Sequence, residues 1–160
     1  MDQLETDIYF MRLALAEAQK AADMEEVPVG AIAVYQGEIV GRGYNRKESD
    51  TDPTAHAEML ALREAAQTLG NWRLLDVTLY CTLEPCPMCA GAMIQARLPR
   101  LVYGAADTKF GADGSIVSIL DPQPSGERQF NHHIEVTRGI LADEALSMLQ
   151  VFFQLLREKK

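Results

Sequence analysis

A strand, a helix start and a second strand follow one another between residues 77 and 105, and this succession constrains the fold more than any other feature. The segments VTLYCTL at 77–83 and RLVYGA at 100–105 are short, apolar runs, which is typical of buried strands. Pro85 and Pro87 between them fit the first turn of a helix, which needs no backbone donor from them. Such a crossover makes the two strands parallel and is almost always right-handed, so helices must cover the sheet.

Two further segments complete the expected sheet. The segment VGAIAVYQGEIVGRGYN at 29–45 consists of two β-branched, apolar runs joined at Gln36 and Gly37, and it predicts a hairpin in which the glycine supplies a positive φ. The segment HIEVTRGI at 133–140 predicts a fifth strand. We therefore expect an α/β fold, with a mixed five-stranded sheet layered with helices.

The helices are predicted from apolar residues that recur with a period near 3.6. One helix is expected over TAHAEMLALREAAQTLG at 54–70, with Thr54 as its N-cap and Gly70 as its stop. A first helix is indicated by Ile8, Met11, Leu15 and Ala18, and a last one by an apolar face of Ala145, Met148, Leu149, Phe152, Phe153 and Leu156.

Length and composition predict a single domain over residues 1–160. A chain of 160 residues with 48% hydrophobic residues can bury one good core. No stretch approaches the roughly 20 consecutive apolar residues of a membrane helix, and the first residues, MDQLETD, are acidic, unlike a secretory signal. We expect a soluble, cytoplasmic protein, with a surface loop at 121–129, DPQPSGERQ.

A formal net charge of -8 argues against a protein that coats nucleic acid without specificity, since such affinity comes largely from Lys and Arg. Any contact with RNA therefore has to come from a local group of basic residues. Basic residues do cluster at Arg97 with Arg100 and in the terminal LLREKK. A cationic helix end that interacts with its own dipole explains that tail equally well.

Cys86 and Cys89 are spaced i and i+3 at the predicted helix start, so their sulfurs can reach one ion. A helix N-terminus lowers the pKa of a cysteine, and the thiolate is the form that binds zinc. Three cysteines in a reducing compartment favour a metal or catalysis over a disulfide framework. Zinc takes four ligands, so this pair needs partners.

The third ligand is expected in PTAHAEML, where His56 stands thirty residues before Cys86. Glu58 follows two residues later, about 200° around a regular helix, so the pair does not serve as two ligands of one ion. One histidine and two thiolates leave the fourth position to water, which makes the zinc site catalytic. Glu58 is then the residue that handles the protons of that water.

Other interpretations of these residues stay open. His56 alone fits a hydrogen-bonded histidine at a helix start, and the cysteine pair alone fits a redox pair or half of a structural zinc site. A structural site has poor candidates for its fourth ligand. Cys81 lies inside a strand as a small buried residue, while His132 and His133 fit surface or strand-edge positions.

The motifs HAE and PCPMC resemble the H-x-E and P-C-x-x-C pattern of zinc-dependent nucleobase deaminases. Longer segments are similar to the bacterial tRNA-specific adenosine deaminases, and they run over nearly the whole chain. They are EVPVGAIAV, GYNR, DPTAHAEMLALREA, NWRLLDVTLYCTLEPCPMCAGAM, NHHIEVTRGIL and FFQLLR.

The resemblance implies a three-layer α/β/α cytidine-deaminase-like fold, a homodimer, one zinc ion per subunit, and conversion of the wobble adenosine of a tRNA anticodon to inosine. Such an enzyme is a hydrolase that acts on the C–N bond of a cyclic amidine. Zinc brings the pKa of its water towards about 7, so that hydroxide can attack C6 of adenine. Glu58 takes the water's proton, delivers it to the ring, and assists the departure of ammonia.

The resemblance also implies residues that bind the tRNA anticodon stem-loop. Asn45 offers an amide that can donate to and accept from the adenine edge, although an asparagine after a strand is more often a turn residue. The backbone of Ala57 and Pro85 lies beside the metal ligands. The contacts to the loop outside the pocket fall on Asp107, Lys109, Asn131, Phe153 and Arg157.

Two features depart from the family pattern, namely the loop around 121–130 and Phe110, where a smaller residue is expected. Both lie near the predicted RNA surface. Two alternatives to the tRNA enzyme therefore remain. One is a deaminase of a free nucleobase or nucleoside, of the adenine, guanine or cytosine type, and the other is a noncatalytic zinc-stabilised binding module, in which Glu58 is a solvated helix residue.

Overall fold

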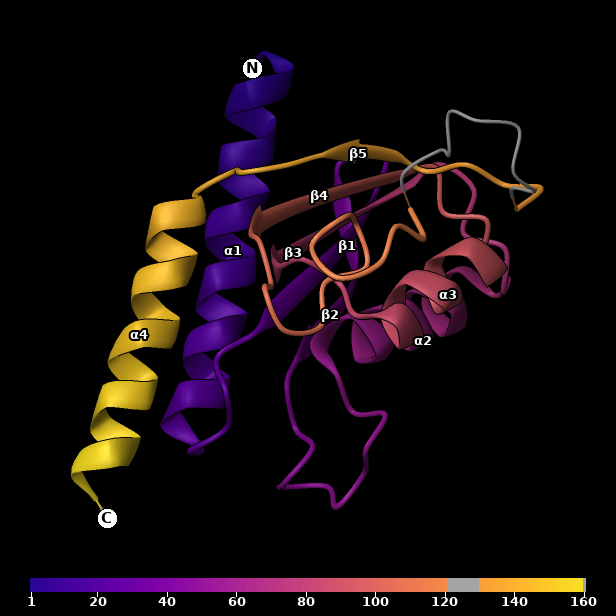
Figure 1. Ribbon diagram of the computed structural model, residues 1–160. Helices are drawn as coiled ribbons and strands as arrows, with labels where there is room; N and C mark the ends of the chain where they lie inside the picture. Colours follow the sequence, from indigo (N-terminus) through magenta and orange to yellow (C-terminus); the bar gives the residue numbers. More distant parts are fainter. Residues whose placement is uncertain (121–129, 160) are drawn as a thin grey trace.

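The computed structural model describes residues 1–120 and 130–159, so the loop expected at 121–129 lies outside the described residues. Over the described residues the chain forms four helices and a five-stranded sheet (Figure 1). In chain order these elements are α1 (Gln3–Asp23), β1 (Gly30–Tyr35), β2 (Glu38–Tyr44), α2 (Ala57–Leu69), β3 (Val77–Leu83), α3 (Pro87–Gln95), β4 (Arg100–Ala105), β5 (Glu135–Thr137) and α4 (Ala142–Glu158).

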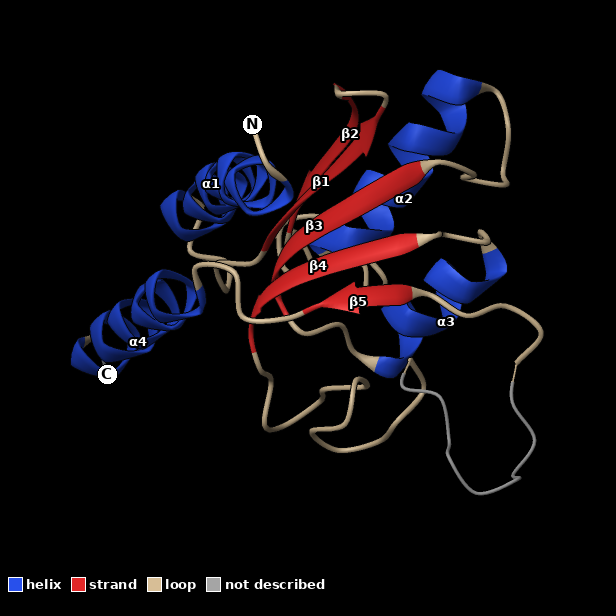
Figure 2. Cartoon of the chain, turned by 90° about the horizontal axis from the view of Figure 1, so that it is seen from above, coloured by secondary structure: helices blue, strands red, loops and turns tan. Residues whose placement is uncertain are grey.

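The sheet has the order β2-β1-β3-β4-β5. Strand β1 pairs antiparallel with both β2 and β3, whereas β3, β4 and β5 run parallel. Helices α1 and α4 cover one face of the sheet, and α2 and α3 cover the other (Figure 2). The mixed sheet, the parallel crossover from β3 through α3 to β4, and the three-layer α/β fold are all confirmed.

The β1–β2 hairpin turns at the two predicted residues. Gln36 has φ of 50° and Gly37 has φ of 78°, so both central residues are left-handed, as a turn that matches the strand twist requires. A Cβ at Gly37 would meet no atom within 4 Å. The glycine therefore serves the backbone conformation of the turn, as the sequence predicts.

Two glycines of β2 let α2 lie directly against the sheet. A Cβ added to Gly43 would stand 2.2 Å from the carbonyl oxygen of Ala57, and one added to Gly41 would stand 2.3 Å from that of Ala61. Any larger side chain at these positions would push the helix away from the strand. This contact fixes the N-terminus of α2, where two of the predicted site residues lie.

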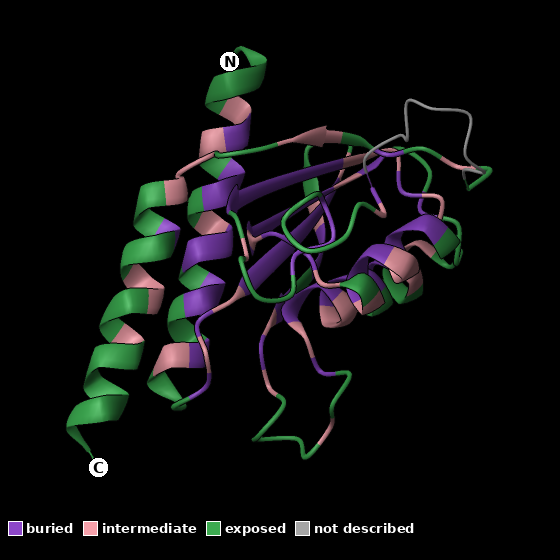
Figure 3. Ribbon diagram, in the orientation of Figure 1, coloured by how far each residue is buried: buried purple, intermediate pink, exposed green. Residues whose placement is uncertain are grey.

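The core lies on both faces of the sheet (Figure 3). Leu79 and Leu101 belong to the part under α2 and α3, whereas their neighbours Tyr80 and Val102 belong to the part under α1. Side chains that alternate between two covered faces explain why β3 and β4 are mostly apolar, with Thr78, Thr82 and Arg100 as the exceptions.

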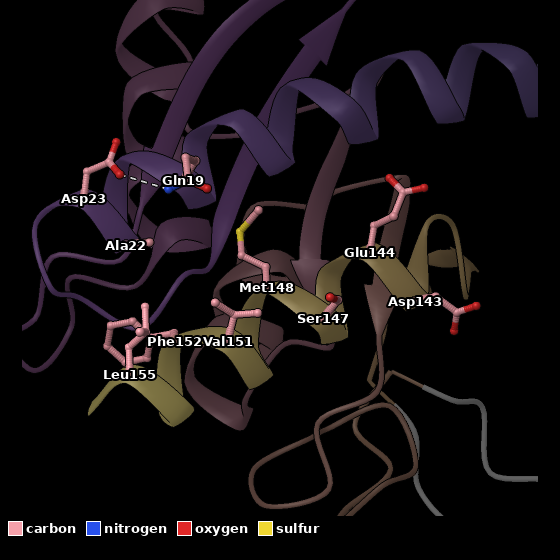
Figure 4. Close-up of a pocket in the computed structure, with 10 residues that line it drawn as sticks. All are labelled: Gln19, Ala22, Asp23, Asp143, Glu144, Ser147, Met148, Val151, Phe152 and Leu155. Carbon is pink, nitrogen blue, oxygen red and sulfur yellow. Dashed lines mark hydrogen bonds between the residues drawn. The ribbon is translucent and has the colours of Figure 1, made fainter. Parts of the chain in front are cut away.

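Helix α4 is less buried than its apolar sequence suggests. Ala145 is the helix's buried residue among those described, while Phe153 and Leu156 keep 38% and 43% of their surface exposed. A hollow of about 650 Å³ lies between α4 and α1 (Figure 4). It is lined by Gln19, Ala22, Asp23, Asp143, Glu144, Ser147, Met148, Val151, Phe152 and Leu155.

Exposed ion pairs join α4 to α1 near both ends of α4. Arg12 contacts Glu144 at 3.1 Å, and Lys159 contacts Glu25 at 2.5 Å. Pairs this exposed contribute little free energy, because water and salt screen the charges. None of the described helices is both long enough and apolar enough to span a membrane.

A buried ion pair holds α1 to the sheet. Two nitrogens of Arg100 donate to the Asp7 carboxylate at 2.9 and 2.7 Å, and the Tyr80 hydroxyl donates to it at 2.9 Å. Burial alone raises the pKa of Asp7, but the bonds from Arg100 and Tyr80 outweigh it and hold that pKa below its usual value. Arg100 also donates to Thr137 at 2.9 Å, which extends the network to β5.

Replacement of Asp7 by asparagine should lower the free energy of unfolding by about 3 kcal/mol at neutral pH, because Arg100 loses its carboxylate. Since the folded pKa of Asp7 is lowered, the wild-type advantage is complete above the unfolded pKa of about 3.9 and is lost as the pH falls through the folded value. Urea unfolding of both proteins across this range measures the difference. A difference that does not shrink in acid would contradict the assignment.

Candidate active site

Three predicted metal ligands meet where the N-termini of α2 and α3 converge. His56 is the N-cap residue of α2, Cys86 is that of α3, and Cys89 lies in the first turn of α3. The His56 Nδ1 atom is 3.5 Å from the sulfur of Cys86 and 3.5 Å from that of Cys89. The ligand atoms of all three residues lie within 4.8 Å of one another.

The prediction of Thr54 as the N-cap of α2 is wrong. The helix begins at Ala57, and His56 occupies the cap position with φ of -77° and ψ of 151°. Thr54 donates from its backbone N–H and its hydroxyl to Asp52 instead, at 2.8 and 2.7 Å. Because His56 is extended rather than helical, its ring can turn towards α3.

The spacing of these ligand atoms fits a tetrahedral zinc ion. Zinc–sulfur bonds of about 2.3 Å and zinc–nitrogen bonds of about 2.0 Å at tetrahedral angles put a sulfur and a nitrogen ligand roughly 3.5 Å apart. Both His56–cysteine distances are 3.5 Å. The donor set of one imidazole and two thiolates is also one that zinc accepts in catalytic sites.

The cysteine pair is electrostatically prepared for a cation. A hydrogen bond from the Cys89 thiol is the largest effect on Cys86, and with a further bond to His56 it overcomes burial and lowers the pKa of Cys86 to about 4. The same bond, together with burial, raises the pKa of Cys89. Zinc binds cysteine as thiolate, so binding by both sulfurs releases any proton that the pair carries.

Glu58 lies beside the three ligands without belonging to their cluster. It is the second residue of α2, and 3% of its surface is exposed. Its carboxyl group is hydrogen-bonded to the Cys89 thiol, and burial raises its pKa to about 7. A carboxyl group in this environment can both accept and return a proton near neutral pH.

The residues predicted to hold the base are all buried. Asn45 is 5% exposed, donates to the Val27 carbonyl at 3.2 Å and accepts from the Lys47 amide at 3.2 Å. Ala57 is fully buried next to His56. Pro85 is buried next to Cys86, and its carbonyl accepts from the Ala112 amide at 2.9 Å.

The residues predicted to contact RNA outside the pocket fall into separate groups. Asp107 and Lys109 follow β4, whose last residue accepts from the Glu84 amide at 2.8 Å, so their segment adjoins the one that carries Cys86. Asn131 is exposed before β5. Phe153 and Arg157 lie on α4, which covers the opposite face of the sheet from α2 and α3 (Figure 2).

The histidine and cysteine considered as alternative ligands are occupied elsewhere. His132 contacts the Leu98 carbonyl through Nε2 at 2.6 Å. Cys81 is fully buried in β3, and burial raises its pKa well above the usual value. Among the described residues, neither belongs to the cluster of metal-ligating side chains.

Sequence reasoning missed Glu84, which is 2% exposed and accepts hydrogen bonds from residues 107–115. One signal was available, because Glu84 is a charged residue between an apolar strand and a proline. That position gives a carboxylate little access to water. The hydrogen-bond partners of Glu84 lie more than twenty residues later in the chain, and no local sequence pattern specifies them.

A model of the cytidine and deoxycytidylate deaminase zinc-binding region matches residues 4–105. The chain belongs to this family. The family's zinc-binding character agrees with the cluster of His56, Cys86 and Cys89, so zinc is its cofactor. The chain is therefore a hydrolase that cleaves a C–N bond, and a noncatalytic binding module is the wrong interpretation.

Similar proteins extend the match beyond the family region. The tRNA-specific adenosine deaminase of Streptococcus pyogenes serotype M18 is 45% identical over 157 residues, which cover 98% of this chain and 96% of that protein. That of Bacillus subtilis is 47% identical over 154 residues, which cover 96% of this chain and 92% of the relative.

A solved structure agrees with these relatives. It comes from a study of A-to-I editing by tRNA:A34 deaminases at the wobble position of transfer RNA. The match has a TM-score of 0.80 and 43% sequence identity, and it covers 88% of this chain and 98% of the other. The predicted resemblance and fold are confirmed.

Alanine in place of His56, Cys86 or Cys89 should reduce bound zinc from about one ion per chain to a small fraction, because three protein ligands leave no redundancy. Cys81→Ala is the matched control, since it removes a buried thiol outside the cluster. It should keep its zinc and lose about 1 kcal/mol of stability. Metal analysis of the purified variants measures this, and zinc loss in Cys81→Ala would contradict the ligand set.

Proposed function

We propose that this protein deaminates the wobble adenosine of a tRNA anticodon: water replaces the amino group at C6, and the products are inosine and ammonia. The observation that carries the proposal is the buried carboxyl group of Glu58 beside the cluster of His56, Cys86 and Cys89. Relatives that are 45% and 47% identical are tRNA-specific adenosine deaminases, which supports adenosine in tRNA as the substrate.

We assign His56, Cys86 and Cys89 as the protein ligands of zinc. When bound, zinc supplies the positive charge that makes a water molecule acidic near neutral pH. His56, Cys86 and Cys89 would hold the ion through one imidazole nitrogen and two thiolates, which is a donor set of catalytic zinc sites. The close approach of α2 to Gly43 holds His56 in place for this role.

Glu58 is assigned as the catalytic acid and base. Its carboxylate accepts a proton from the attacking water and transfers it to N1 of adenine as oxygen bonds to C6. It then moves the proton from the new hydroxyl group to the departing amine, the C6–N bond breaks, and ammonia leaves. Glu58 ends the cycle in its starting protonation state, so one buried carboxyl group suffices.

Asn45, Ala57 and Pro85 are assigned to hold the base. The Asn45 amide is already fixed by Val27 and Lys47, and it retains donor and acceptor capacity for an adenine edge. The backbone of Ala57 and Pro85 directly flanks His56 and Cys86. A base that has left its stack can be held in this way while its neighbours bind outside.

The tRNA anticodon stem-loop is proposed as the binding partner, with contacts to Asp107, Lys109, Asn131, Phe153 and Arg157. The segment after β4 adjoins the metal site, which supports the first two. Phe153 and Arg157 lie on the exposed surface of α4. We further propose one deaminase domain over residues 1–160, a homodimer, and a cytoplasmic location, where cysteines stay reduced.

Glu58→Gln should lower kcat for a stem-loop with wobble adenosine by about 10³-fold and leave zinc content unchanged, because the amide cannot transfer the proton. Glu64→Gln is the matched control, since Glu64 is exposed on the same helix. It should keep wild-type kcat. Inosine formation by mass spectrometry gives the rates. Loss of zinc in Glu58→Gln would show instead that Glu58 is a ligand.

The zinc-loaded protein should deaminate an anticodon stem-loop and leave free adenosine and adenine unreacted. A substrate that positions its base through contacts outside the pocket loses rate when those contacts are removed. All three compounds are offered at equal concentration, and inosine or hypoxanthine is quantified. Reaction of free adenosine or adenine without reaction of the stem-loop would identify a small-molecule deaminase.

A further inference from the structure

Glu84 is a buried carboxylate that the proposed chemistry does not use. It stands between the last residue of β3 and the ligand-bearing turn that begins α3, and 2% of its surface is exposed. No ion pair with a lysine or arginine is formed by Glu84 within the part of the chain that the structure describes. A buried charge without a counter-ion is costly unless hydrogen bonds compensate it.

The compensating donors all come from the β4 loop, defined as residues 106–120. Glu84 Oε1 accepts from the Asp107 amide at 3.0 Å and from the Ser115 hydroxyl. Oε2 accepts from the Asp113 amide at 2.8 Å and from the Ser115 amide at 3.3 Å. One carboxylate therefore fixes three positions of a loop that has no regular ladder of its own.

The backbone on both sides of Glu84 binds the same segment. The Glu84 amide donates to Ala105 at 2.8 Å, and the Pro85 carbonyl accepts from Ala112 at 2.9 Å. A Cβ added to Gly111 would stand 2.3 Å from Glu84 Oε2, so the loop passes the carboxylate at a distance that only glycine allows. The loop is thus folded around the Glu84 side chain.

A separate anchor holds the β4 loop on its other side. Asp113 accepts from the Tyr103 hydroxyl at 2.7 Å and from two nitrogens of Arg138 at 2.5 and 2.8 Å. These bonds connect the loop to β4 and to the residue after β5. The bond from the Asp107 amide to Glu84 connects the start of the loop to the segment that carries Cys86.

The exposed part of the β4 loop lies directly after this start. Lys109 is exposed, and 64% of the Phe110 surface is exposed. The Asp107 carboxylate accepts from the amides of both, at 3.0 and 3.2 Å, so a displaced Asp107 would move both side chains. A cation and an aromatic ring side by side suit a phosphate and an unstacked base.

We propose that Glu84 is a positioning residue for the RNA substrate, which holds the β4 loop against the metal-bearing turn so that Lys109 and Phe110 meet the anticodon loop in fixed places. This inference rests on the proposed function. Glu84 touches neither the base nor the reacting atoms, so its effect is on substrate binding. Preorganisation of a binding loop acts by reducing the ordering that binding requires.

Glu84→Gln places an amide nitrogen opposite a backbone N–H, and Ser115→Ala removes one donor from an exposed residue without disturbing the fold. In Glu84→Gln, hydrogen exchange of the Asp107, Asp113 and Ser115 amides should accelerate by roughly tenfold or more. KM for the stem-loop should rise by roughly tenfold, with kcat within about threefold of wild type and zinc content unchanged. Ser115→Ala should shift the same quantities less.

Asp7→Asn is the matched control, because it removes a buried carboxylate that binds Arg100 at the start of β4, the opposite end of the strand from the β4 loop. It should lose stability without any change in loop exchange or KM. If hydrogen exchange of the loop amides is unchanged in Glu84→Gln, or is faster while KM is unchanged, the inference is wrong but the proposed function stands. Zinc loss with a fall in kcat would also overturn it and make Glu84 a support for Cys86. A wild-type protein inactive on the stem-loop would overturn the proposed function and this inference together.

Discussion

The parallel crossover from β3 through α3 to β4 is the constraint on which the rest of the structure depends. Because β3 and β4 run parallel, with Leu79 opposite Leu101, their carboxyl ends lie at one edge of the sheet. Helix α3 must start at that edge, which puts Cys86 and Cys89 there, and the β4 loop must leave from it. The antiparallel β1 and β2 bring α2 to the same edge through its contact with Gly43. The metal site is therefore a consequence of strand direction, and pockets in open α/β sheets form at such edges for the same reason.

Three of the buried carboxyl groups that the structure describes have three different environments. Asp7 is paired with Arg100, and its pKa is held below the usual value. Glu84 has backbone amides and a hydroxyl group around it. Glu58 lies beside the metal ligands, where burial raises its pKa to about 7 although its own backbone amide, His56 and the Cys89 thiol act in the opposite direction. The environment of Asp7 stabilises a negative charge, as a structural role requires, whereas that of Glu58 permits a proton to come and go near neutral pH.

Local patterns in the sequence predicted most of the fold and the centre of the site. The bounds of β3 and β4, the turn at Gln36 and Gly37 and the stop at Gly70 are as predicted, because each depends on residues close together in the chain. The ligand cluster was predictable because its residues carry unusual chemistry at two helix starts. Local patterns did not predict the cap of α2, the bonds of Glu84 or the exposure of α4. Each of these depends on contacts with residues that are distant in the sequence. Phe153 and Leu156 form an apolar face by period, yet periodicity cannot say whether another element covers it.

Net charge bears on why loop order matters for the proposed function. A chain with a formal charge of -8 cannot rely on general attraction to phosphates, so the proposed binding of RNA requires a few contacts in fixed places. Lys109 and Phe110 extend from a loop without helix or strand, and each bond that orders this loop in advance removes entropy that RNA binding would otherwise cost. The Glu84 carboxylate lies at the base of this loop, where backbone amides donate to it and little solvent reaches it. It can therefore organise the loop from the interior, while Lys109 and Phe110 form the exposed surface.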